Sequence, residues 1–121
     1  MDRYLLEDFI SRHYGAEPEH LWMRYPSFAV FRHAENRKWF AVVMTVKAAC
    51  LGIKSDAPID IVNLKCGRER YPDLIENVGI YPAYHMSKGQ WISVMLDGTV
   101  SPKKLKVLLE LSHKLTQNKQ R

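Results

Sequence analysis

Apolar side chains near both ends of the chain recur every three or four positions, which is the spacing of one face of an α-helix. Asp2 and Ser101 stand where each helix would begin, and both residue types are favourable N-caps. Gly15 suits the end of the first helix, and Pro102 suits the first turn of the last. The apolar positions are Leu5, Leu6, Phe9 and Ile10 in the first segment, and Leu105, Leu108, Leu109 and Leu115 in the last.

Between these helices the pattern changes to runs rich in β-branched and aromatic residues, which is typical of strands. The predicted strands cover 28–32, 39–46, 59–66 and 90–96, and the first two form a hairpin across the polar segment 34–38. We also predict loops at 47–58 and 80–86 and a short helix within 68–78.

The strand 39–46 is apolar on both of its faces. Alternation along a strand would place Phe40, Val42, Met44 and Val46 together, with Ala41 and its neighbours opposite. This pattern predicts a central strand that is covered on both sides.

The order of elements predicts an α+β fold. We expect an antiparallel sheet with the N- and C-terminal helices packed on one face and a short helix between strands. A chain of 121 residues has the size of a single domain, so residues 1–121 are assigned to one core.

Composition adds few constraints. The formal net charge of +5 is compatible with a polyanionic partner, but it does not require one. No run of about 20 apolar residues and no signal peptide are present, so we expect a cytoplasmic protein with no membrane contact. We also expect a monomer. Cys50 and Cys66 are expected to be reduced and buried.

Two separated motifs resemble the MmcQ/YjbR family. The first is the strand 62–66 (VNLKC), and the second is the segment 84–91 (YHMSKGQW), followed by Leu96-Asp97-Gly98 and the capped last helix. Ser87 stands where this family usually has Asn. The resemblance covers the chain from Phe28 onward. It implies a double-wing fold related to that of frataxin-like proteins, and it implies DNA binding.

Lys65, His85, Lys88 and Trp91 lie within these two motifs. If their strands are neighbours, two ammonium groups, an imidazole and an indole converge at one end of the sheet, which suits a phosphate or carboxylate. The structural alternative is that Trp91 belongs to the core, the lysines lie on the surface and His85 bonds a loop carbonyl. Ser112, on the apolar stripe of the last helix, is expected to bond a carbonyl of the preceding turn.

Arg37 and Lys38 in the hairpin turn form an auxiliary basic pair that could contact phosphates. A solvated basic surface explains them equally well.

Catalysis is not indicated, because Ser87, His85 and Asp97 lack the sequence context of a nucleophile elbow. We expect no cofactor, because neither a P-loop nor GxGxxG occurs, and no metal site, because the five histidines are scattered.

Two functions therefore remain open. The first is a non-enzymatic protein that binds DNA or another polyanion through a basic face. The alternative is a binder of a small anionic or planar aromatic ligand in a pocket near Trp91. A flat basic surface would favour the first, and a concave, partly apolar cleft would favour the second.

Overall fold

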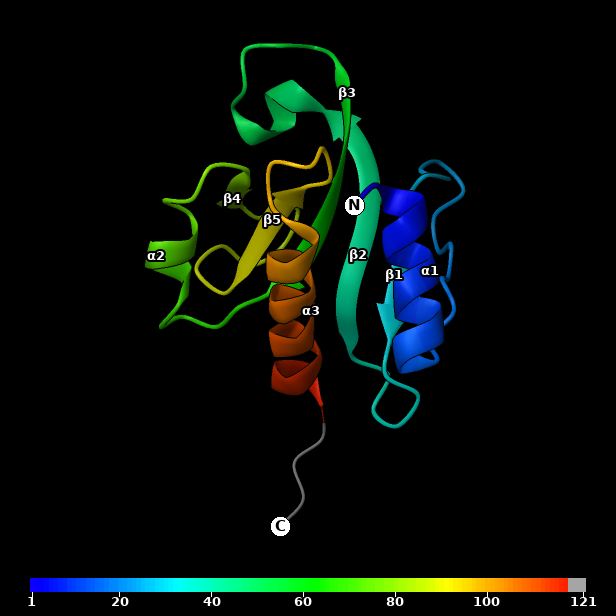
Figure 1. Cartoon of the computed structure of the whole chain (residues 1–121). Helices are drawn as coiled ribbons and strands as arrows, with labels where there is room; N and C mark the ends of the chain where they lie inside the picture. Colours follow the sequence, from blue (N-terminus) through cyan, green and yellow to red (C-terminus); the bar gives the residue numbers. More distant parts are fainter. Residues whose placement is uncertain (118–121) are drawn as a thin grey trace.

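The computed structural model describes residues 1–117 and contains one five-stranded antiparallel sheet in the order β1-β2-β3-β5-β4 (Figure 1). Its elements are α1 (Arg3–Tyr14), β1 (Ala29–Arg32), β2 (Trp39–Lys47), the 3-10 helix η1 (Ala48–Leu51), β3 (Pro58–Lys65), α2 (Tyr71–Leu74), β4 (Ile80–Pro82), β5 (Trp91–Met95) and α3 (Pro102–Thr116). The predicted α+β class is confirmed. Lys119 and Arg121, the two basic residues at the C-terminal end of the sequence, lie outside the described residues.

The two long helices begin at the predicted caps. The Asp2 carboxylate accepts a hydrogen bond from the Leu5 amide at 2.9 Å, and the Ser101 hydroxyl accepts one from the Lys104 amide at 3.1 Å. Gly15 ends α1 with a φ of 67°, a left-handed conformation that glycine adopts without strain. These local signals were sufficient to place both helices.

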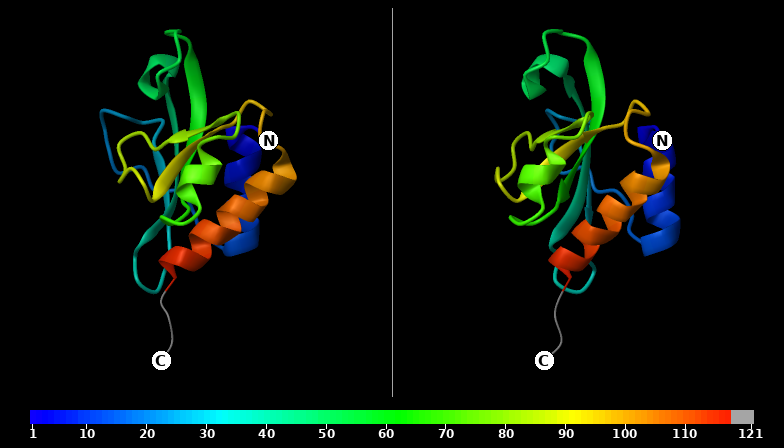
Figure 2. Two further views of the ribbon diagram at one scale, coloured as in Figure 1. Left: turned by 90° about the vertical axis from the view of Figure 1, so that its left-hand side faces the viewer. Right: turned by 60° about the vertical axis from the view of Figure 1, so that its left-hand side comes forward.

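Both long helices pack on the same face of the sheet, as predicted (Figure 2). Leu6 and Ile10 of α1 and Leu105 and Leu109 of α3 are buried against Val62 and other strand residues in a single cluster.

The opposite face of the sheet, which we call the loop face, carries a second cluster. Its buried members are Val30, Val42, Met44, Val46 and Ile61. Instead of helices, the connector 16–28, the η1 region and the β4–β5 loop lie over it (Figure 2). The prediction that β2 is covered on both sides is therefore confirmed, although loops form one of the two layers.

The prediction that Phe40 shares a face of the sheet with Val42 and Met44 is wrong, because β2 contains a bulge. Phe31 pairs with Ala41 and Arg32 pairs with Trp39, so Phe40 is an extra residue in β2. An extra residue shifts the alternation of side chains. Phe40 consequently joins Ala41 on the helix-covered face, and Trp39 moves to the loop face.

Ser112 bridges the sheet at this bulge. Its hydroxyl donates to the Phe40 carbonyl at 2.6 Å and accepts from the Lys65 amide at 2.9 Å. The bond that we expected, to a carbonyl of the preceding turn of α3, is not the one formed. Ser112 instead satisfies two backbone groups of neighbouring strands and fixes the end of β3, where Lys65 stands.

The predicted short helix within 68–78 is confirmed as the four residues of α2. Two further sequence expectations need correction. The segment 80–86, expected to be a loop, begins with the edge strand β4. Cys66 is buried, but Cys50 is exposed because it lies in η1, outside the sheet. None of the helices in the described part of the chain is long and apolar enough to cross a membrane.

A pair of histidines packs where α3 meets the β1–β2 turn. The ring centroids of His33 and His113 lie 4.3 Å apart, and the His113 ring stacks on the Tyr14 ring with 4.4 Å between their centroids. His33 Nε2 lies 2.8 Å from the Thr116 hydroxyl, which also lies 2.8 Å from the Ser112 carbonyl. Burial lowers the pKa of both imidazoles, and the neighbouring His33 lowers the pKa of His113 further.

This pair predicts a loss of stability in mild acid. Because burial lowers the pKa of both rings in the native state, the unfolded chain binds more protons than the native state once the pH falls toward about 6.5, the ordinary pKa of histidine. We expect the urea midpoint to be highest above that pH and to fall steadily as the pH is lowered further. His33→Gln should flatten this profile, whereas His20→Gln, in the exposed connector, should not. An unchanged slope in His33→Gln would show that the His33 imidazole does not contribute to the loss.

Candidate functional site

A buried polar pair on β3 and β5 holds the loop that carries His85. The Asn63 amide donates to the Tyr84 carbonyl at 2.8 Å, and the Ser93 hydroxyl accepts from the Tyr84 amide at 3.0 Å. The Ser93 hydroxyl in turn donates to the Asn63 side-chain oxygen at 2.5 Å. Both side chains are fully buried. The backbone of Tyr84 is therefore fixed to the sheet from both sides.

His85, the next residue, has a φ of 61°. This left-handed conformation costs a residue with a side chain roughly 1–2 kcal/mol, although histidine tolerates it better than most. The bonds that Asn63 and Ser93 make to Tyr84 offset this cost. In this conformation the exposed His85 ring lies against the Tyr84 ring, with 4.0 Å between the ring centroids.

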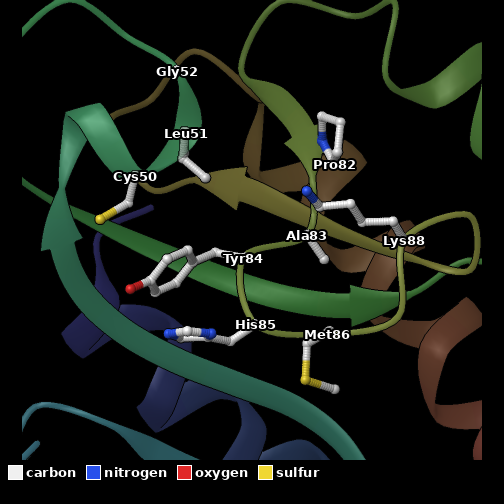
Figure 3. Close-up of a pocket in the computed structure, with 9 residues that line it drawn as sticks. All are labelled: Cys50, Leu51, Gly52, Pro82, Ala83, Tyr84, His85, Met86 and Lys88. Atoms are coloured by element: carbon white, nitrogen blue, oxygen red, sulfur yellow. The ribbon is translucent and has the colours of Figure 1, made fainter.

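The loop encloses a hollow against η1. This Tyr84 cavity has a volume of about 600 Å³ (Figure 3). Its lining includes Cys50 and Leu51 from η1, Pro82 from β4, and Tyr84, His85 and Lys88 from the loop. In Figure 3 the Tyr84 phenol points toward the Cys50 sulfur, and the Lys88 side chain reaches back along the loop over Ala83.

The charge of the cavity is positive. Among the described residues that line it, Lys88 alone carries a permanent charge, and none is acidic. Burial, followed by the neighbouring Cys50 thiol, raises the pKa of the Tyr84 hydroxyl, which therefore remains a neutral hydrogen-bond donor. A lysine, an imidazole and a phenol at one hollow can together neutralise and hydrogen-bond an anion.

Of the four predicted site residues, two line this cavity and two flank it. His85 and Lys88 are in the lining. Lys65 and Trp91 are cross-strand partners on β3 and β5. The backbone of Lys88 forms an isolated parallel β-bridge with that of Trp91. Since their neighbours Leu64 and Ile92 belong to the helix-side core, Lys65 and Trp91 both face the loop side of the sheet. Trp91 is partly exposed.

The auxiliary pair does not line the cavity. Arg37 and Lys38 are exposed in the β1–β2 turn, and Arg37 itself has a φ of 63°. The Arg37 guanidinium lies 3.7 Å from the Glu19 carboxylate, so part of its charge is compensated. Lys38 has no side-chain hydrogen bond or ion pair among the described residues.

Asn63, Ser93 and Tyr84 were missed by the sequence analysis. A polar Asn63 within the apolar run 61–66 was the available signal, because buried amides are retained only where they find partners. Cys50 and Leu51 carried no signal, since η1 reaches the loop only through the tertiary fold. Within residues 1–117, no three His, Cys, Asp or Glu side chains come together as a metal site.

Fold and site together define a small α+β domain with a positively charged recess beside its sheet. The chain belongs to the YjbR family, whose model, described as YjbR, matches residues 11–115. The match extends the resemblance seen in the sequence into α1.

Its relatives include an uncharacterised protein, YyaQ of Bacillus subtilis (strain 168). The two are 38% identical over 108 residues, which is 89% of this chain and 92% of the relative. A crystal structure of a Pseudomonas syringae protein has 40% sequence identity and a TM-score of 0.95, covering 97% of this chain and 100% of that one. A solution NMR structure from the same organism has 39% identity and a TM-score of 0.89, covering 100% and 97% of the respective chains. Deinococcus radiodurans DR2400, at 24% identity and a TM-score of 0.64 over 86% of this chain and 70% of its own, shares the fold.

Proposed function

We propose that the protein is a non-enzymatic binding protein that takes a small anionic ligand in the Tyr84 cavity. The observation that carries this proposal is the lining itself, with Lys88, His85 and Tyr84 around one recess and no carboxylate among the described lining residues. A volume of about 600 Å³ lies within the range of roughly 300–1,000 Å³ that is common for small-molecule sites.

The recessed shape favours a small anion over duplex DNA. Both hypotheses use the exposed cations on the loop face, but DNA binding through phosphates needs an accessible array of charges. Here Lys88 lies at a hollow, and Arg37, at the β1–β2 turn, already pairs with Glu19. DNA or another polyanion remains the competing hypothesis, supported by the net charge of +5 and by the cations Lys65, Lys88 and Lys38.

The positions of the candidate catalytic residues support a binding role over catalysis. His85 and Ser87 lie in the loop before β5, whereas Asp97 follows the far end of that strand. The Asp97 carboxylate accepts from the Thr99 amide at 3.0 Å, within its own turn. A nucleophile, base and orienting carboxylate are therefore not assembled around His85.

Titration of ¹⁵N-labelled protein with inorganic phosphate tests the proposal, because amide shifts report both weak binding and its location. We expect saturable shifts confined to residues 50–52 and 82–88. A random-sequence duplex, titrated across a salt series, should give no binding of comparable strength. Absence of saturable shifts with phosphate, together with salt-dependent duplex binding, would replace the small-anion proposal with the DNA hypothesis.

A further inference from the structure

A second hollow lies on the loop face next to the Tyr84 cavity. This aromatic cavity has a volume of about 290 Å³. Its walls include Trp22, Tyr25 and Phe28 from the connector, Trp39 and Met44 from β2, and Met86 from the β4–β5 loop.

The aromatic side chains hold one another in fixed orientations. The Trp22 ring meets Trp39 edge-to-face at 5.7 Å and Phe28 edge-to-face at 5.8 Å. Tyr25 stacks on Phe28 at 5.1 Å and is 52% exposed. Edge-to-face contacts of this kind stabilise a preformed apolar wall. The exposed Tyr25 ring remains free on one side to stack on a ligand.

His85 and Met86 line both cavities. They directly follow Tyr84, whose backbone Asn63 and Ser93 fix to the sheet. The two cavities therefore meet at one rigid turn, with Lys88 on one side of it and the aromatic walls on the other. In Figure 3 the Met86 side chain points away from Lys88, in accord with this division.

We infer that the two cavities form one bipartite site for a small molecule in which a planar ring carries an anionic group. The anion is held in the Tyr84 cavity by Lys88, and the ring lies in the aromatic cavity. This inference rests on the proposed function and adds the ligand's second half. Ring stacking on Tyr25 and Trp39, and contact with the Met44 and Met86 thioethers, supply affinity that a bare anion cannot obtain.

The probe pair is inorganic phosphate and 1-naphthyl phosphate, which differ only in the ring. We expect 1-naphthyl phosphate to bind about 5–150-fold more tightly and to change the tryptophan fluorescence of Trp22 and Trp39, since one stacked ring contributes roughly 1–3 kcal/mol. Tyr25→Ala should remove most of this advantage while leaving inorganic phosphate binding unchanged. Tyr4→Ala is the control, because Tyr4 is 77% exposed on α1, on the opposite side of the sheet.

The outcomes separate this inference from the proposed function. Equal affinities for the two probes, or no effect of Tyr25→Ala on either, would overturn the bipartite site and leave the anion site standing. If neither probe binds to the wild-type protein, both the bipartite site and the anion site of the proposed function are overturned. Adenosine monophosphate and a single-stranded oligonucleotide, used as further probes, distinguish a small molecule from a polymer. Binding of the oligonucleotide alone would contradict the small-molecule assignment.

Discussion

Replacing Asn63 by alanine is expected to lower the free energy of unfolding by about 2–4 kcal/mol, because it removes a hydrogen-bond partner from two polar groups at a fully buried position. These groups are the Tyr84 carbonyl and the Ser93 hydroxyl, which lie 2.8 Å and 2.5 Å from the Asn63 side chain. The Ser93 side chain is fully buried, so water does not replace the bond that its hydroxyl donates to Asn63. The strained turn at His85 then loses half of its support, so the Tyr84 cavity should lose its shape together with the stability.

Urea denaturation of the wild type and of three variants measures this effect. Ser93→Ala should cost less, about 1–3 kcal/mol, and provides a readout if Asn63→Ala does not fold. Ser87→Ala is the matched control, because its exposed hydroxyl in the same loop makes no side-chain hydrogen bond among the described residues. A loss below about 0.5 kcal/mol in Asn63→Ala, the range of ordinary surface substitutions, would show that the pair does not hold the loop.

The second large effect is expected from charge reversal at Lys88. Lys88→Glu removes the cation of the Tyr84 cavity and adds a negative charge there, so phosphate affinity should fall by at least about a hundredfold, as expected for losing a charge-assisted hydrogen bond and gaining repulsion. Lys65→Glu should have a smaller effect, because Lys65 flanks the cavity beside Trp91 without lining it. The double variant should abolish binding. Phosphate titration followed by amide shifts measures all three.

Lys103→Glu is the control for overall electrostatics. It makes the same change of net charge at an exposed residue in the first turn of α3. If Lys103→Glu weakens phosphate binding as much as Lys88→Glu does, the long-range field of the protein, and not the Tyr84 cavity, determines affinity. If Lys65→Glu has the larger effect, the anion lies beside Trp91 and outside the cavity.

The parts of the fold that sequence predicted are those with local causes. Asp2, Gly15 and Ser101 each act through bonds within a few residues, so their roles were visible without a structure. The strands followed from residue type and alternation. The alternation failed at Phe40, because the bulge depends on how β1 pairs with β2 and leaves no sign in the sequence of β2 alone.

The site was predictable only in part, for the same reason. Register pairs Lys65 with Trp91, as the sequence hypothesis of neighbouring strands required. The recess itself depends on η1, which the β2–β3 connection brings to the loop, and on the left-handed φ of His85. Neither has a local signal. Ser112 was noticed as polar on an apolar helix stripe, but its partners on β2 and β3 are distant in sequence.

Alkylation of Cys50 provides the most direct test of the anion site. Cys50 is exposed and lines the Tyr84 cavity, whereas Cys66 is buried and burial raises the pKa of its thiol, so Cys66 should react slowly and serve as an internal reference. We predict that inorganic phosphate, but not chloride at equal ionic strength, slows iodoacetamide modification of Cys50 in the wild type. The same phosphate should give no protection in the Lys65→Glu/Lys88→Glu variant. Identical rates in phosphate and chloride for the wild type would contradict binding of an anion in this cavity.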